Sequence, residues 1–218
     1  MGSESPSVPI TVADALPQLR TGRLARGDDL TNNRPAKHLI DRRRAYFRQH
    51  ARAVLRGTLT RHPDEQHRAI RRRISGARAV ARELWELVAR RPTWRVLHSV
   101  QSDGGARELD QLVIGPGGVF SIHTVYRPEQ EITADAALQE ARRTQEILGR
   151  ATRVPITVRP VIVFVGADQP RVAGSPNGFE MFTADELVPW LQQLKPVLTE
   201  RELEIVHLAA RDRRTWVA

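Results

Sequence analysis

Apolar positions recur with a helical period in two long segments of the first half of the chain. Residues 1–36 precede them and are predicted to be a disordered tail, because their apolar positions are scattered among serine, glycine, asparagine and proline. An amphipathic helix is then expected over about 36–59, within a linker at 37–65. A second helix is expected over 64–89. Gly76 interrupts its pattern, which indicates a junction of two helices or a close approach to another element.

The first helix has an apolar stripe that is expected to pack on the main domain. Docking on a partner or on an anionic membrane is the alternative use of such a stripe. Its members are Ile40, Phe47, Ala51, Val54 and Leu55.

Alternating and continuous apolar runs predict strands in the second half of the chain. The expected strands are 94–100, 108–114, 119–125, 159–166 and a short one at 179–182. A tight hairpin at Gly115-Pro116-Gly117-Gly118 joins the second strand to the third. The β-branched run at 159–166 indicates a strand that is buried on both faces, and a helix at 134–148 leads into it.

Two capping boxes open the last helices. Thr183 with Glu186 and Thr199 with Glu202 begin helices that are expected to end near residues 194 and 211. The order is helix, three antiparallel strands, crossover helix, strand, short strand and helices. It predicts an α/β domain with three layers and a central mixed sheet over 66–218.

Charge distinguishes the N-terminal third from the rest. Residues 1–75 contain 16 Lys and Arg against 7 Asp and Glu, a net +9, whereas residues 76–218 contain 18 of each and are neutral. A basic arm on a neutral body is typical of chains that meet nucleic acid or an anionic surface, and also of an arm that is simply solvated.

Composition removes several classes of protein. The 218 residues include no cysteine, which excludes disulfides, thiolate metal sites and a cysteine nucleophile. No apolar run reaches the roughly 20 residues of a membrane span, and the N-terminus lacks the pattern of a signal peptide. We therefore expect a cytoplasmic protein.

The segments at Trp94–Val100 and Leu109–Ile122 resemble the nuclease-related domain family, NERD. They contain a strand with an aspartate, then a Gly-Pro-x-Gly turn, then a strand that ends at the position of the family's catalytic pair. The resemblance covers about residues 66–218, with downstream segments similar to actinobacterial members. It implies a restriction-endonuclease-like fold of the PD-(D/E)XK group, in which two carboxylates hold Mg²⁺ and a lysine activates water.

The catalytic motif of that family is degenerate in this chain. Its aspartate is present as Asp110, but its acid-x-lysine pair falls on His123-Thr124-Val125. Its upstream Gly-Glu pair falls on Gly76-Ala77. Neither valine nor alanine can bind a metal or a phosphate, so an inactive nuclease fold is expected.

A rebuilt site is the catalytic alternative. Asp110 and His123 would be its catalytic residues and, with Glu108, would hold a softer ion such as Mn²⁺ or Zn²⁺. An ordinary buried Asp-His hydrogen bond is the simpler interpretation. No cofactor is expected, and Mg²⁺ or Mn²⁺ would matter only if the degenerate site is active.

Three functions follow from these patterns. The leading hypothesis is an inactive nuclease fold that binds nucleic acid, in the first place DNA, without base specificity. Its expected phosphate contacts are Arg42, Arg43, Arg44, Arg71, Arg72 and Arg73. The alternatives are a metal-dependent nuclease with the rebuilt site, and a scaffold whose basic helix docks on a protein or an anionic membrane. The four tryptophans are interpreted as core or edge packing.

Overall fold

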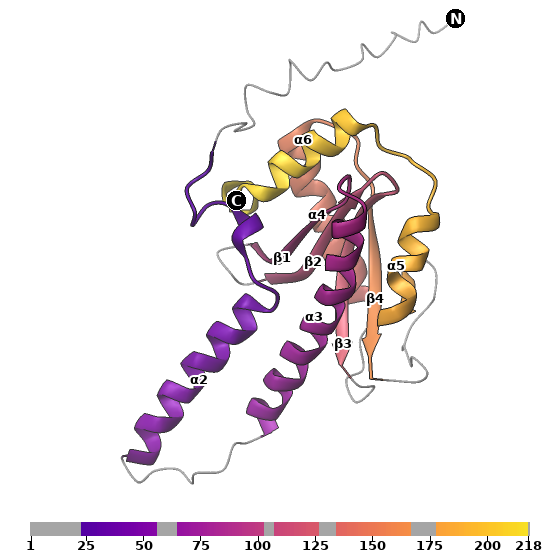
Figure 1. Cartoon of the computed structure of the whole chain (residues 1–218). Helices are drawn as coiled ribbons and strands as arrows, with labels where there is room; N and C mark the ends of the chain where they lie inside the picture. Colours follow the sequence, from indigo (N-terminus) through magenta and orange to yellow (C-terminus); the bar gives the residue numbers. More distant parts are fainter. Residues whose placement is uncertain (1–22, 56–64, 103–106, 127–133, 167–177, 218) are drawn as a thin grey trace, which may run out of the picture.

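A computed structural model describes residues 23–55, 65–102, 107–126, 134–166 and 178–217 (Figure 1). The helices are η1 (Leu30–Asn32), α2 (Lys37–Leu55), α3 (Glu65–Arg90), α4 (Ala134–Thr152), α5 (Ala184–Gln193), α6 (Glu200–Arg211) and η3 (Arg213–Trp216). The strands are β1 (Arg95–Ser102), β2 (Arg107–Gly115), β3 (Gly118–Tyr126), β4 (Val158–Val165) and β5 (Glu180–Thr183). The predicted elements are all present, with bounds shifted by a few residues.

The strands form one mixed sheet in the order β1-β2-β3-β4-β5. The first three are antiparallel, whereas β3 pairs in parallel with β4, and β4 in parallel with β5. Helix α4 makes the crossover from β3 to β4, because a parallel neighbour requires the chain to return to the same end of the sheet. The predicted three-layer α/β fold is therefore confirmed.

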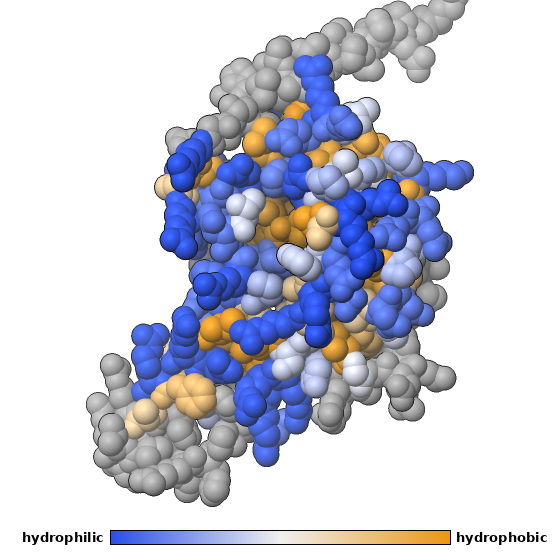
Figure 2. Space-filling model, in the orientation of Figure 1, coloured by the Kyte–Doolittle hydropathy of each residue, from blue (hydrophilic) through white to orange (hydrophobic). Residues whose placement is uncertain are grey.

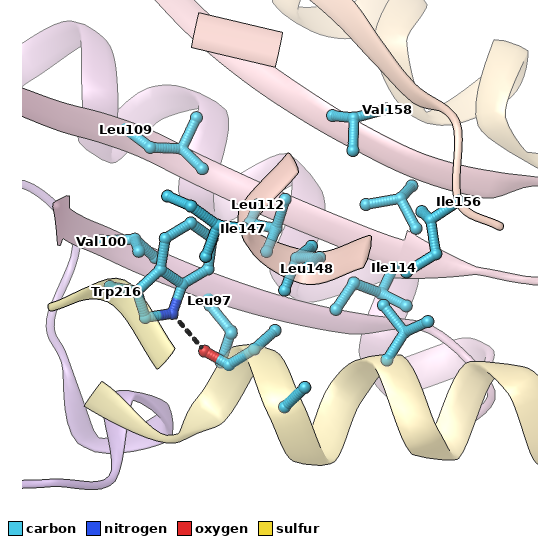
Figure 3. Packing of buried hydrophobic residues seen from close by; sticks show 14 of the residues in the cluster. Leu97, Val100, Leu109, Leu112, Ile114, Ile147, Leu148, Ile156, Val158 and Trp216 are labelled. Carbon is cyan, nitrogen blue, oxygen red and sulfur yellow. Dashed lines mark hydrogen bonds between the residues drawn. The ribbon is translucent and has the colours of Figure 1, made fainter. Parts of the chain in front are cut away.

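Helices cover both faces of the sheet. The face toward α3 and α5 buries residues such as Leu84, Phe120 and Leu187, and the opposite face packs against α4 and α6. Figure 3 shows the apolar cluster on the face toward α4 and α6, in which strand side chains meet Leu148 of α4. Trp216 closes this cluster by donating its indole N–H to the carbonyl of Ala210 at 2.8 Å.

The hairpin between β2 and β3 is as tight as its glycines predict. Gly115 pairs with Gly118, which has a φ of 123°, a value that favours glycine. A Cβ on Gly115 would lie 2.2 Å from the ring of Trp94. The glycine therefore allows the indole to pack against the strand.

Helix α3 runs through Gly76 without a break, so the first of the two interpretations of this glycine is wrong and the second is confirmed. A Cβ at Gly76 would lie 3.0 Å from Cβ of Tyr126 and 3.2 Å from Cγ2 of Thr124. The glycine brings α3 close to the end of β3.

The structure differs from the prediction of a disordered tail between residues 23 and 36. This stretch contains η1 and buries Leu30. Asp29 forms an ion pair with Arg211 and a backbone bridge with Asp212, at the far end of the chain. Composition could not reveal contacts across more than 180 residues. Residues 1–22 lie outside the described part.

Helix α2 packs against α3 through its first turns. Leu39 and Ile40 meet Ile70 and Ile74 of α3, whereas Phe47, expected in the packed stripe, is 47% exposed. The side chains of Val54 and Leu55 lie outside the described part. Over the described residues, no helix is long and apolar enough to cross a membrane.

Candidate functional site

Strands β2 and β3 part from each other at Asp110 and His123, a place we call the fork. Their ladder runs from the hairpin to the pair Gln111 and Ile122. At the next position, a side chain replaces the backbone of β2 as the hydrogen-bond acceptor. Oδ2 of Asp110 accepts a hydrogen bond from the Thr124 N–H at 2.9 Å. Beyond the fork, β2 continues alongside β1 and β3 alongside β4.

The neighbouring strand is also irregular at the fork. Ser99 of β1 lies opposite Asp110 and has a φ of 52°, in the left-handed region that a serine rarely adopts. Its Oγ accepts a hydrogen bond from the Lys37 N–H at 2.9 Å, and its carbonyl accepts one from the Asn33 side-chain amide at 3.1 Å. This distortion anchors the start of α2 beside the fork.

His123 lies on the α4 side of the fork. Its Nδ1 is 3.8 Å from a carboxylate oxygen of Glu140, a residue of α4. Burial lowers the pKa of His123, but the interaction with Glu140 and the charge of Asp110 outweigh this effect and raise the pKa above its usual value. His123 therefore faces two carboxyl groups, at the position where the resemblance expects the acid of the family's acid-x-lysine pair.

Glu108 also has an internal partner. Its Oε2 lies 2.7 Å from Nε2 of His38, the second residue of α2. Burial raises the pKa of Glu108, but His38, with smaller contributions from Gln101 and Arg73, outweighs it and leaves the pKa below its usual value. The basic arm thus reaches the candidate site through His38.

The other face of the fork is closed by neutral groups. Thr124 donates its hydroxyl to Gln111 at 3.3 Å, and Gln111 donates its amide to the carbonyl of Ala77 at 3.1 Å. Ala77, at the position of the family's glutamate, is buried against α2. Val125, at the position of its lysine, belongs to an apolar cluster with Ala137 and Phe164.

Metal ligation has little support at the fork. Within the part of the chain that the structure describes, no group of three or more His, Asp and Glu side chains is placed to hold an ion. The predicted set Asp110, His123 and Glu108 is therefore not such a group. A cavity of about 250 Å³ beside the fork is lined by Glu108, Glu140 and Arg143, among mostly apolar residues.

The six arginines expected to bind phosphate do not share one surface. Arg71 is exposed, Arg72 lies 3.1 Å from Glu65, and the charge of Arg73 lowers the pKa of Glu108 and of His123. On α2, Arg44 lies 3.5 Å from Asp41, whereas Arg42 and Arg43 have no acidic partner among the described residues.

A basic pocket lies instead between the start of α2 and the middle of α3. Its volume is about 550 Å³, and it is lined by Asn32, Arg34, Pro35, Lys37, Ile40, Asp41, Arg43, Arg44 and Arg78. Asp41 pairs with Lys37 at 3.1 Å and with Arg44. Over the described residues, Arg34, Arg43 and Arg78 have no acidic partner. Figure 2 shows hydrophilic side chains over most of the face formed by α2 and α3, with an apolar strip between the helices.

The comparison with protein families bears on the fork. Residues 72–165 match the model of the nuclease-related domain, NERD. The match begins in α3, ends with β4 and contains the fork, so the predicted resemblance is confirmed for this stretch. The start of α2 and most of the basic pocket lie outside the NERD match. Comparisons with curated proteins and with solved structures found no match.

Several residues of these sites escaped the sequence analysis. His38 and Glu140 face Glu108 and His123 at the fork, and Arg34 and Arg78 line the basic pocket. Trp85, expected to be packed, is 70% exposed. Arg78 and Trp85 are seven residues apart and so lie on one face of α3. This spacing was the signal in the sequence that could have indicated that the two act together.

Proposed function

We propose that this protein is a non-catalytic nuclease fold that binds nucleic acid through phosphate contacts of arginines on α2 and α3. The basic pocket supports this function best, because three of its arginines have no acidic partner within the described residues. Arginines without partners are free to release counterions on meeting a phosphate backbone.

The lack of catalysis is supported by the internal pairing at the fork. The Asp110 carboxylate accepts a backbone hydrogen bond, and His123 lies between it and Glu140. A divalent cation would have to displace the His123 side chain from these carboxylates and would find no lysine at Val125 to help activate water. A phosphate entering the nearby cavity would also meet the carboxylates of Glu108 and Glu140.

Phosphate recognition is assigned first to Arg34, Arg43 and Arg78, with Arg42, Arg44 and Arg71 as further contacts around them. Arg72 and Arg73 face acidic groups of the protein and contribute less. Binding of this kind reads little sequence, because phosphates are the same at every base.

The experiment measures fluorescence anisotropy of a short labelled DNA duplex with the full-length protein across a salt series. The triple variant R34A/R43A/R78A should weaken binding at low salt at least tenfold and reduce the slope of log K against log salt by about 2–3. The control R142A/R150A/R201A removes the same charge from exposed positions of α4 and α6, across the sheet. It should change both quantities much less.

Two results would overturn parts of this proposal. Equal binding by the two triple variants would mean that the phosphate contacts lie outside the basic pocket. Cleavage of the duplex with Mg²⁺ or Mn²⁺ that is lost in D110N would establish an active site at the fork. If no nucleic acid binds and anionic vesicles do, the scaffold function takes its place.

A further inference from the structure

One face of α3 carries a continuous row of exposed residues, which we call the α3 stripe. It consists of Arg71, Ser75, Arg78, Arg82 and Trp85. The intervals alternate between four and three residues, so these side chains project from the same side of the helix. All five are exposed.

The charges of the α3 stripe are not neutralised by the protein. Among the described residues, Arg71, Arg78 and Arg82 have no acidic partner. Of the acidic side chains on α3, Glu65 pairs with Arg68 and Arg72, and Glu86 pairs with Arg90. Glu83 follows Arg82 in sequence but forms no ion pair with it among the described residues. The stripe therefore presents three positive charges to the solvent.

Trp85 differs from the other three tryptophans. Trp94 and Trp216 are buried, at 5% and 2% exposure, and the Trp190 ring packs on Phe120 and Phe182. Trp85 is 70% exposed, and no ring or cation–π contact involves it within the described part of the chain. A large apolar ring held in water on a basic helix face has its surface available for a flat ligand.

The α3 stripe continues from the basic pocket. Arg78 belongs to both, and Trp85 follows it by seven residues, a rise of about 10 Å along the helix. Arg82 lies between them, about 6 Å from Arg78 along the axis. A backbone bound at the pocket can therefore extend along α3 and bring one of its bases to the indole.

We propose that the α3 stripe binds single-stranded nucleic acid, with Arg71, Arg78 and Arg82 at the phosphates and one base stacked on Trp85. This inference rests on the proposed function and names its ligand class. Bases in a duplex are already stacked on their neighbours, whereas a single strand can offer the face of a base to an aromatic side chain. Every base has such a face, so stacking on Trp85 adds affinity without sequence preference.

The test compares labelled single-stranded DNA and RNA with the corresponding duplexes, using the full chain and anisotropy at several salt concentrations. W85A should weaken single-strand binding by about 5- to 150-fold, the range expected for losing one stacked base. W85F should retain most of the affinity because it keeps an aromatic face. Duplex binding should change less than about twofold, because base faces there are covered.

Two features make the readout specific to stacking. W85A removes no charge, so the salt slope of single-strand binding should equal that of the unchanged protein. F47A is the matched control, since Phe47 is an exposed aromatic residue outside the α3 stripe, and it should leave the affinity unchanged. Trp85 is exposed, so its replacement should also leave the urea unfolding midpoint unchanged.

The outcomes separate this inference from the proposed function. Single-strand binding that is unchanged in W85A, or weakened equally for duplexes, would overturn base stacking. The proposed function would still stand if R34A/R43A/R78A weakened the remaining binding. Absence of binding to every nucleic acid at low salt would overturn both.

Discussion

The basic pocket and the α3 stripe together form what we call the basic surface. The fork and the basic surface are both rich in charged residues, but they differ in how these residues are paired within the protein. At the fork, Asp110 accepts a backbone N–H, Glu108 faces His38, and His123 faces Glu140. On the basic surface, Arg44 pairs with Asp41, whereas the other arginines lack acidic partners among the described residues. These are Arg34, Arg43, Arg71, Arg78 and Arg82.

The difference separates charges that serve the fold from charges that can serve a ligand. A buried ionised group needs a partner inside the protein, because it has lost the solvation of water. An exposed arginine keeps its hydration, and nothing in the fold requires it to be paired. The NERD match therefore includes a site whose charged groups face partners inside the protein, while the unpaired arginines of the basic surface lie before and along α3.

The largest effect is expected at Asp110. Asp110→Ala removes the acceptor of the Thr124 N–H and the counter-charge of His123, and should destabilise the protein by about 1–3 kcal/mol. Asp110→Asn keeps an acceptor oxygen and should cost less. Urea unfolding measures both changes.

Asp41→Ala is the matched control on the basic surface. Asp41 is exposed and pairs with Lys37 and Arg44, so its loss should cost less than about 1 kcal/mol. Equal costs for Asp110→Ala and Asp41→Ala would show that the fork carboxylate is no more important to the fold than a surface one.

The second effect is a dependence of stability on pH. The folded pKa of His123 lies above its unfolded value near 6.5, so its contribution is complete below pH 6.5 and is lost as the pH rises through the folded pKa. His123→Gln should therefore be less stable than the unchanged protein at pH 6, with the difference narrowing toward pH 9. Urea midpoints across this range measure it.

His98 and His207 provide an internal contrast. Burial lowers the pKa of His98 and of His207 to about 4. Their neutral forms stabilise the fold above pH 6.5, and this contribution is lost as the pH falls toward 4. His123→Gln should leave this loss of stability between pH 6.5 and 4 unchanged. A His123→Gln variant that altered stability only in that acidic range would contradict a raised pKa of His123.

Much of this fold could be predicted because its signals are local. Alternation, capping boxes and the Gly-Pro-Gly turn each depend on neighbouring residues, and they predicted β1 to β5 and the helices within a few residues. The same local patterns located Asp110 and His123 on adjacent strands.

The partners of those residues could not be predicted in this way. Glu140 meets His123 only because α4 crosses back over the sheet, and His38 meets Glu108 only because Ser99 anchors the start of α2. The spacing of a row of arginines also does not say which of them faces an acid. Arg71, Arg72 and Arg73 are adjacent in sequence, but Arg71 is exposed, Arg72 pairs with Glu65, and the charge of Arg73 acts on the fork.

A smaller effect is expected when the basic surface is neutralised. R34A/R43A/R78A should change the free energy of unfolding by less than about 0.5 kcal/mol, since these arginines lack ion-pair partners within the described residues. Thermal unfolding at low salt measures this change, with Asp110→Ala as the destabilised reference. A loss comparable to that of Asp110→Ala would mean that these charges support the fold after all.

The smallest effect concerns Arg73, the arginine of α3 whose charge acts on the fork. Its positive charge lowers the pKa of both His123 and Glu108. Arg73→Gln should therefore raise both pKa values, because the charge that opposes protonation is removed. NMR titration of the His123 imidazole measures the shift directly. Arg71→Gln removes the same charge from the exposed α3 stripe and should leave that titration unchanged. If both variants shifted His123 equally, the fork would respond to the overall charge of α3, and the division between an internally paired fork and an unpaired basic surface would not hold.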